Sequence, residues 1–276
     1  MVYASSRQRT IVLVNRNTWE WDGGSWVQVD DMGPLDSQAS IYDTLRRRVI
    51  SFATKNKVGE TWEWDGVSWT QLADTGPGSR ATAMAYDSVR DRVVLFGGSP
   101  VGPVDGTSTA TGFFADTWEW DGEDWTQQED QGPAGRLGHA MVYDSVRQQT
   151  LMFGGIGTEG DHGDTWAWDG ESWKLLVGFG PSPRYWHALA YDDTGEQTVL
   201  FGGSYTLSGS GRPVLGDTWT WDGQHWIQRQ DMGPPARYGA RMVYDSDRHV
   251  MVLFGGGGAP DAHGQHPQLH DTWELN

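Results

Sequence analysis

A seven-residue motif, Asp-Thr-Trp-Glu-Trp-Asp-Gly, recurs along the chain in more or less complete form and limits its possible folds most strongly. Its threonine stands at positions 18, 61, 117, 165, 218 and 272, so the repeat is 43 to 56 residues long. A period in this range indicates units that bury their faces only against neighbouring units, as in propellers and solenoids. Because the repeat covers the 276 residues, we expect one domain and no second fold.

Each repeat is expected to form four short strands, and the fourth repeat shows this most clearly. Its β-type runs are 139–143, 149–153, 165–168 and 173–176, and each run is bounded by turn residues. In the third run, alternation places both tryptophans on one face, and the Asp-Gly pair that follows tolerates the positive φ of a tight hairpin. Four short antiparallel strands per repeat are typical of a propeller blade.

Three motifs carry a resemblance to a known family. Phe-Gly-Gly closes the second expected strand in four repeats, a Tyr-Asp pair ends the first strand, and a Trp opens the fourth. Across essentially the whole chain, this pattern resembles the Kelch repeat, as in the central domain of galactose oxidase. The resemblance implies an all-β, six-bladed Kelch-type β-propeller with four short antiparallel strands per blade. We expect the blades at about 1–34, 35–77, 78–133, 134–181, 182–234 and 235–276.

The two ends of the sequence and the loops qualify this expectation. The sixth repeat stops after its third strand, so either the last blade has three strands or the chain is trimmed from a longer one.

The resemblance also implies that the first strand of each blade lies along a central channel. The loops from strand four to the next strand one, and from strand two to three, then share one face. These loops vary here, whereas the opposite turns do not, which favours a binding site at the variable mouth.

Composition excludes several classes of function. The formal net charge is −17, which disfavours nucleic acid and anionic membrane surfaces as partners. The chain has no cysteine, which excludes disulfides, thiolate metal sites and cysteine nucleophiles. Among proteins with Kelch repeats, the copper site of galactose oxidase and the iron site of specifier proteins both need a Cys. The Kelch resemblance therefore does not imply either metal site for this chain. The N-terminus shows no signal peptide and no segment is apolar enough to span a membrane, so we expect a cytoplasmic, monomeric protein without a cofactor. The alternative is a secreted protein, if the chain is trimmed from a longer precursor.

One of the 17 tryptophans departs from the repeat. The others occupy recurring positions, where packing between blades explains them. Trp186 instead follows Arg184 and Tyr185 in a variable loop. It is expected either to line a ligand pocket, together with Tyr185, or to fill the channel mouth.

Arginine recurs after the Gly-Pro turn of four repeats, as Arg80, Arg136, Arg184 and Arg237. Such a ring could clamp a carboxylate or a phosphate, as arginines do in Kelch proteins that bind acidic peptides. The interpretation we favour is structural, with each arginine bonded to loop carbonyls or to an Asp between adjacent blades, because recurrence is itself an architectural trait. Tyr238 follows the last of these arginines and is a further candidate contact.

Histidines provide candidates for proton transfer and for metal binding. His139 and His187 each lie three residues after a recurring arginine and could act as general acid or base, although a hydrogen bond to a neighbouring blade is the favoured interpretation. His263, His266 and His270 form the densest set of possible metal ligands. Their loop is rich in Gly and Pro, so a solvated loop is the favoured interpretation.

The loops between strands two and three differ in length around the predicted ring. Long loops at 99–115, 204–216 and 257–270 carry apolar groups that suit a binding surface, among them Phe114 and Tyr205. The first two repeats have short loops and lack Phe-Gly-Gly, and the second has Leu-Asp-Ser-Gln where an arginine is expected. Arg16, Asp36 and Gln38 are therefore candidate contacts on a low side of the face.

The sequence favours a recognition module for a protein, a peptide or a small anionic molecule, bound at the mouth of the channel. The alternative is a cysteine-free enzyme of the metabolite cyclase, lyase or isomerase type with its active site at the same place. A purely structural protein is the third possibility, in which the arginines are buried in bonds between blades. No nucleophile elbow, phosphate-binding loop or dinucleotide fingerprint is present to decide between them.

Overall fold

The computed structural model describes residues 1–100, 112–128, 131–176, 180–207, 213–229, 233–261 and 264–275. The chain divides into two compact units, Met1–Leu137 and Gly138–Asn276. Within the described residues all regular structure is β, and no helix is long and apolar enough to cross a membrane.

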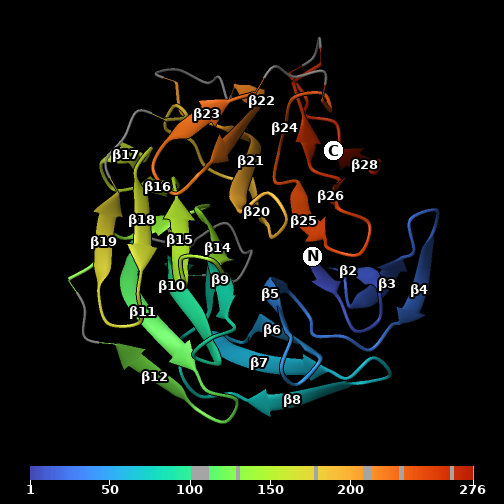
Figure 1. The fold of residues 1–276 in the computed structure, drawn as a ribbon. Helices are drawn as coiled ribbons and strands as arrows, with labels where there is room; N and C mark the ends of the chain where they lie inside the picture. The colour runs from blue at the N-terminus through green and yellow to red at the C-terminus, as the bar shows by residue number, and fades with distance from the viewer. Residues whose placement is uncertain are drawn as a thin grey trace. The chain divides into compact units, whose positions relative to one another are not determined.

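The first unit contains three four-stranded antiparallel sheets, each built from strands that follow one another in sequence (Figure 1). The first sheet consists of β1 (Val2–Ala4), β2 (Arg9–Val14), β3 (Asn17–Trp21) and β4 (Trp26–Asp30). The second consists of β5 (Ser37–Asp43), β6 (Arg48–Lys55), β7 (Val58–Trp64) and β8 (Trp69–Ala73). The third consists of β9 (Arg80–Asp87), β10 (Arg92–Pro100), β11 (Phe114–Trp120) and β12 (Trp125–Gln128), and β13 (Arg136–Leu137) ends the unit.

The second unit repeats the pattern (Figure 1). Its first sheet consists of β14 (Ala140–Asp144), β15 (Gln149–Phe153), β18 (Thr165–Trp168) and β19 (Trp173–Leu176), with the small hairpin β16 (Ile156–Gly157) and β17 (Gly160–Asp161). The next consists of β20 (Ala188–Asp192), β21 (Gln197–Ser204), β22 (Val214–Trp221) and β23 (Trp226–Gln228). The sixth repeat has three paired strands in the described residues, β25 (Arg241–Asp245), β26 (Val250–Phe254) and β28 (Thr272–Leu275), and the short pair β24 (Arg237–Tyr238) and β27 (Gly257–Gly258).

The strands of the fourth repeat lie close to where the sequence predicts them. The second, third and fourth strands have the expected bounds, and β14 begins one residue later than expected. The Asp-Gly hairpins explain this precision. In the fourth repeat, Asp169 Oδ1 accepts hydrogen bonds from the backbone N–H groups of Glu171 and Ser172, and Gly170 has φ near 99°. Only a residue without a Cβ adopts that conformation cheaply, so the turn is fixed locally.

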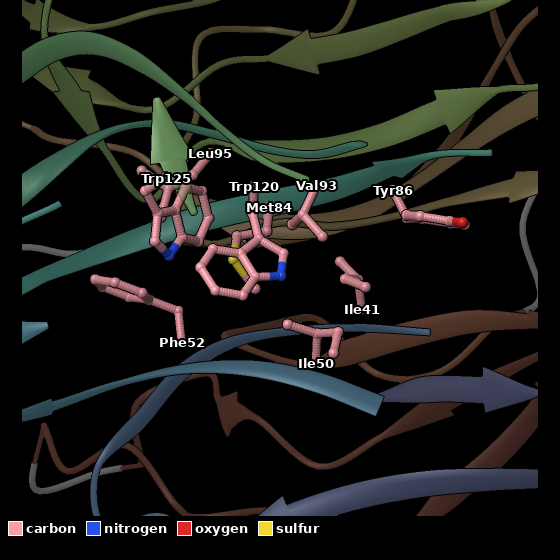
Figure 2. Close-up of a cluster of buried hydrophobic side chains, with 9 residues drawn as sticks. All are labelled: Ile41, Ile50, Phe52, Met84, Tyr86, Val93, Leu95, Trp120 and Trp125. Atoms are coloured by element: carbon pink, nitrogen blue, oxygen red, sulfur yellow. The ribbon is translucent and has the colours of Figure 1, made fainter. Parts of the chain in front are cut away.

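Apolar clusters between neighbouring sheets form the core. In the first unit, one cluster joins side chains of β5 and β6 to side chains of the third sheet, as Figure 2 shows. Its members are Ile41, Ile50, Phe52, Met84, Tyr86, Val93, Leu95, Trp120 and Trp125. The repeated tryptophans also pair across each hairpin, and the rings of Trp120 and Trp125 lie 5.6 Å apart. Packing between sheets therefore explains the recurring tryptophans.

The recurring threonine of the motif links one repeat to the next. Trp69 Nε1 donates a hydrogen bond to Thr18 Oγ1 at 2.8 Å, so the fourth strand of the second repeat is tied to the third strand of the first. The same bond joins Trp125 to Thr61 at 2.7 Å and Trp226 to Thr165 at 2.9 Å. Buried polar groups need such partners, which explains why Thr is retained beside the tryptophans.

Candidate functional site

Arg80, Arg184 and Arg237 each form a buried ion pair with an aspartate of the same repeat. Arg184 is only 1% exposed, and its Nη1 and Nη2 donate to the two carboxylate oxygens of Asp217 at 2.7 and 2.9 Å. The remaining donors bond to Gly202 O, Ser182 O and Ser182 Oγ. These five bonds use all five N–H groups of the guanidinium. Asp217 Oδ2 also accepts from Trp219 Nε1, so the unit is tied to the motif.

The same unit recurs in other repeats. Arg80 pairs with Asp116 and donates to Gly97 O, while Arg237 pairs with Asp271 and donates to Gly255 O. Arg136 is equally buried, and its Nε donates to Ala134 O. The contacts of Arg80, Arg184 and Arg237 lie within one repeat, whereas the sequence-based interpretation placed them between adjacent blades. For these three side chains the structural role is the one that the geometry supports.

Phe-Gly-Gly belongs to this unit. In the third, fifth and sixth repeats the first glycine supplies the carbonyl that the arginine bonds. Both glycines have positive φ, as at Gly202 (66°) and Gly203 (104°), and the strand pairing shifts there. The second repeat lacks both the arginine and Phe-Gly-Gly, and the first repeat also lacks Phe-Gly-Gly. The strands of both repeats pair without a bulge at this place, from Lys55 to Val58 for example. In the second repeat the arginine and the glycines are thus absent together, because they form one unit.

Trp186 occupies a backbone position that neighbouring repeats give to glycine. The residue two positions after the recurring arginine is Gly138 in the fourth repeat and Gly239 in the sixth, with φ of 69° and 66°. Trp186 has φ of 52° at the same place. Its N–H donates to Gly138 O, and its carbonyl accepts from Gly239 N–H, both at 2.7 Å. A bulky residue in the left-handed region is strained by about 1–2 kcal/mol, so glycine would be the cheaper choice.

The indole of Trp186 lies in an aromatic cluster that consists of Tyr185, Trp186, Tyr238 and His266. The Trp186 ring stacks on Tyr238 with centroids 5.8 Å apart and meets Tyr185 edge-on at 5.1 Å. His266 meets Tyr238 edge-on at 5.4 Å. Trp186, Tyr238 and His266 are partly exposed, whereas Tyr185 is buried. The cluster therefore offers aromatic surface to solvent, and its members come from the variable loops of the fifth and sixth repeats.

Gly138 makes room for this cluster, which gives a test of the arrangement. A Cβ at Gly138 would lie 2.9 Å from Trp186 Cδ1, whereas a Cβ at Gly239 would meet no atom within 4 Å. Gly239→Ala should therefore lose only the about 1–2 kcal/mol of its left-handed backbone. Gly138→Ala should lose more and displace the indole, which urea denaturation and near-ultraviolet circular dichroism would measure. Equal losses and unchanged spectra in the two variants would contradict this packing.

His139 and His187 are both buried, as equivalent residues of the fourth and fifth repeats. The His187 ring packs edge-on against Phe153 at 5.4 Å. Burial, and then the nearby Arg184 and His139, lower the pKa of His187 to about 3. The imidazole is therefore neutral at physiological pH. A general base works best with a pKa near the operating pH, so this environment does not favour proton transfer by His187.

Arg241 is a candidate that the sequence interpretation missed. It opens β25, is partly exposed, and has no hydrogen-bond or ion-pair partner among the described residues. Burial lowers the pKa of its guanidinium below the usual value. One sequence feature could have identified it, because the second to fifth repeats have Ala at the equivalent position, as at Ala188.

The remaining predicted contact residues are distributed over both units. In the first unit, Arg16 and Asp36 are exposed, and Gln38 is half-buried and donates to Asp36 O. Phe114 lies under the Arg80 guanidinium at 3.9 Å and borders an open hollow of about 1050 Å³. This hollow is lined by Phe113, Phe114, Ala115, Asp116, Gln127, Gln128 and Gln131. In the second unit, Tyr205 is half-buried at the end of β21.

The histidines proposed as metal ligands have other surroundings. His266 Nδ1 lies 2.8 Å from Gly258 O, and its ring belongs to the aromatic cluster. His270 is exposed, and His263 lies outside the described residues. Within the part of the chain that the structure describes, no group of three or more His, Asp or Glu side chains is arranged to hold a metal ion.

Within each unit, antiparallel sheets built from consecutive strands follow one another along the chain and pack on their neighbours, as in the β-propeller class of fold. The solved structures support this class. One that matches is the structure of YjhT, with a TM-score of 0.63 and 16% sequence identity over 82% of this chain and 73% of that chain. This likeness concerns the fold alone. No protein-family model matches the chain, and no curated protein matches it.

Proposed function

We propose that the chain is a Kelch-type recognition module, which binds a protein, a peptide or a small anionic molecule through the aromatic cluster. The observation that carries the proposal is Trp186 in a left-handed conformation where both neighbouring repeats use glycine. Strain of this kind persists where another requirement outweighs it, and it gathers at functional sites. Large, rigid aromatic side chains are also the groups that contribute most to binding surfaces.

The geometry supports a contact of limited size. Trp186 and Tyr238 present stacked rings whose inner sides are closed by Tyr185 and by the backbone of Gly138. A ring or an apolar side chain of the ligand can pack on them, while the neighbouring loops provide polar groups. Thr206, for example, donates its Oγ1–H to Asp161 Oδ1 at 3.0 Å and so ties two of these loops together. A rigid surface of this kind binds without a large entropic cost.

The alternative function, an enzyme that uses His139 or His187 for proton transfer, has weaker support. The low pKa of His187 argues against it, and two of the arginines that would hold a substrate, Arg184 and Arg237, are engaged with aspartates. A non-catalytic module needs neither group.

Trp186→Gly tests the proposal. Glycine fits the backbone at this position, because Gly138 and Gly239 hold the same conformation in the adjacent repeats. We expect ligands that raise the melting temperature of the wild-type protein in a thermal-shift screen to lose that effect in the variant, since binding to the native state raises stability. Leu175→Ala, at an exposed position of the outer strand β19, is the control and should respond as the wild type does. Ligands that stabilise Trp186→Gly and the wild type equally would refute the role of the cluster.

A further inference from the structure

Arg241 interrupts a repeated apolar position. The residue opposite the phenylalanine of the second strand is alanine in four successive repeats. The pairs are Ala39 with Phe52, Ala83 with Phe96, Ala140 with Phe153, and Ala188 with Phe201. In the sixth repeat Arg241 lies opposite Phe254. Ala39 and Ala140 pack on the apolar clusters shared with the following repeat, whereas the sixth repeat carries a charged side chain at this place.

The charge of Arg241 is uncompensated in the described chain. Arg237, four residues earlier, pairs with both oxygens of Asp271. No carboxylate of the described residues pairs with Arg241, although the protein has 37 acidic residues. The side chain of Arg241 is only partly exposed, and this burial lowers the pKa of its guanidinium. A desolvated charge without a counter-ion is costly, and an anion that binds to it recovers that cost.

Arg241 also lies beside the aromatic cluster in the chain. Gly239 N–H donates to Trp186 O, and Tyr238 stacks on the Trp186 ring, so the two residues before Ala240 are fixed to the cluster. Ala240 and Met242 pack on the core shared with the fifth repeat. Because side chains alternate along a strand, Arg241 projects from the opposite face of β25, away from that core. Figure 1 shows β24 and β25 in succession at the start of this repeat.

We propose that Arg241 binds the carboxylate of a singly charged ligand. This inference rests on the proposed function for one point only, the packing of the ligand body on the aromatic cluster. A planar guanidinium matches a carboxylate with two parallel N–H···O bonds. One positive charge balances one negative charge. A phosphate dianion would retain an unbalanced charge at a partly desolvated place in a protein of net charge −17. The ligand class is therefore a monocarboxylate with an aromatic or apolar body.

Three probes of similar shape test this class by calorimetric titration at about pH 8, above the second pKa of a phosphate ester. They are 3-phenylpropionate, its neutral amide, and 2-phenylethyl phosphate. We expect the wild-type protein to bind 3-phenylpropionate about tenfold more tightly than either of the others, or better, since hydrogen bonds between charged groups contribute that much. Arg241→Gln should reduce the three affinities to within about twofold of one another.

The matched control is Arg47→Gln. It removes the same charge at an exposed turn, where Gln8 and Gln148 hold the same backbone conformation in other repeats. This variant should retain the wild-type preference. Circular dichroism of Arg241→Gln verifies that the fold is intact. Arg241→Lys keeps the positive charge but lacks the planar pair of N–H donors, so it should retain part of the preference for the carboxylate.

The outcomes separate this inference from the proposed function. If 2-phenylethyl phosphate binds most tightly, if the preference for the carboxylate survives in Arg241→Gln, or if 3-phenylpropionate does not bind to the wild type at millimolar concentration, the carboxylate assignment is wrong. Trp186→Gly should weaken the three probes by a similar factor. If it leaves all three unchanged while Arg241→Gln abolishes the preference, the aromatic cluster is not the binding surface, and the assignment of Arg241 stands.

Discussion

Arg184→Met should lower the free energy of unfolding by about 3–5 kcal/mol, because it leaves the carboxylate of Asp217 without its counter-ion. Arg184 is almost completely buried, and Asp217 is three-quarters covered, with 24% of its side chain exposed. Burial alone would raise the pKa of Asp217, but the bonds from Arg184 outweigh it and lower that pKa below the usual value. Met has a similar volume, so the loss reports the charge and its hydrogen bonds. Urea denaturation at neutral pH measures it.

Two further variants define the origin of the effect. Arg48→Met removes a looser and more exposed ion pair, with Arg48 3.8 Å from Glu63, and should cost less than about 1 kcal/mol. Arg184→Met combined with Asp217→Asn should recover part of the loss, because asparagine removes the buried charge and can still accept from Trp219 Nε1. Equal small losses in Arg184→Met and Arg48→Met would mean that the arginine unit does not support the fold.

The second large effect is a loss of stability in mild acid that depends on His187. The folded-state pKa of about 3 lies below the unfolded value of about 6.5, so the unfolded chain takes up the proton first as the pH falls. The contribution of His187 is therefore complete above the unfolded pKa and declines as the pH falls below it. Between about pH 7 and pH 5 it should amount to a loss of about 2 kcal/mol.

His187→Thr should remove this decline. Threonine is suited to the position because Thr82 holds it in the third repeat, where its hydroxyl donates to Phe96 O. Urea denaturation of the variant and of the wild type at pH 7 and pH 5 measures this. The loss of stability between the two pH values should be about 2 kcal/mol smaller in the variant than in the wild type. His225→Thr, at a histidine whose side chain is 72% exposed, is the control and should lose as much stability between pH 7 and pH 5 as the wild type does. If His187→Thr loses as much stability between the two pH values as the wild type, the imidazole of His187 accepts a proton as readily in the folded protein as in the unfolded chain.

The sequence predicted the fold well where local chemistry determines it. The Asp-Gly turns set the hairpins, and alternation sets the face of each tryptophan, so the strands of the fourth repeat lie close to the predicted bounds. The sequence also showed that the first two repeats lack Phe-Gly-Gly and that the second lacks the arginine. It did not show why, because the bond from Arg184 Nη1 to Gly202 O joins residues of different strands and depends on a bulge at two glycines.

The candidate site was predicted only in part. Trp186 stood out because it departs from the repeat, but its left-handed backbone and its stacking on Tyr238 depend on the neighbouring repeats. The recurring arginines attracted attention by their number, although recurrence reflects a structural requirement. Arg241 was missed because it is a single exception at a position that is otherwise alanine, and its lack of an acidic partner is a property of the folded chain.

The stability of Trp186→Gly tests most directly the central claim, that Trp186 is retained for a ligand and not for the fold. The variant loses the stacking on Tyr238 and the burial of part of the indole, and it relieves the left-handed strain, so the losses are offset in part. We predict that its free energy of unfolding, from urea denaturation, falls by less than about 2 kcal/mol. A loss of about 3 kcal/mol or more, comparable to that of Arg184→Met two residues away, would contradict the claim and make Trp186 part of the core.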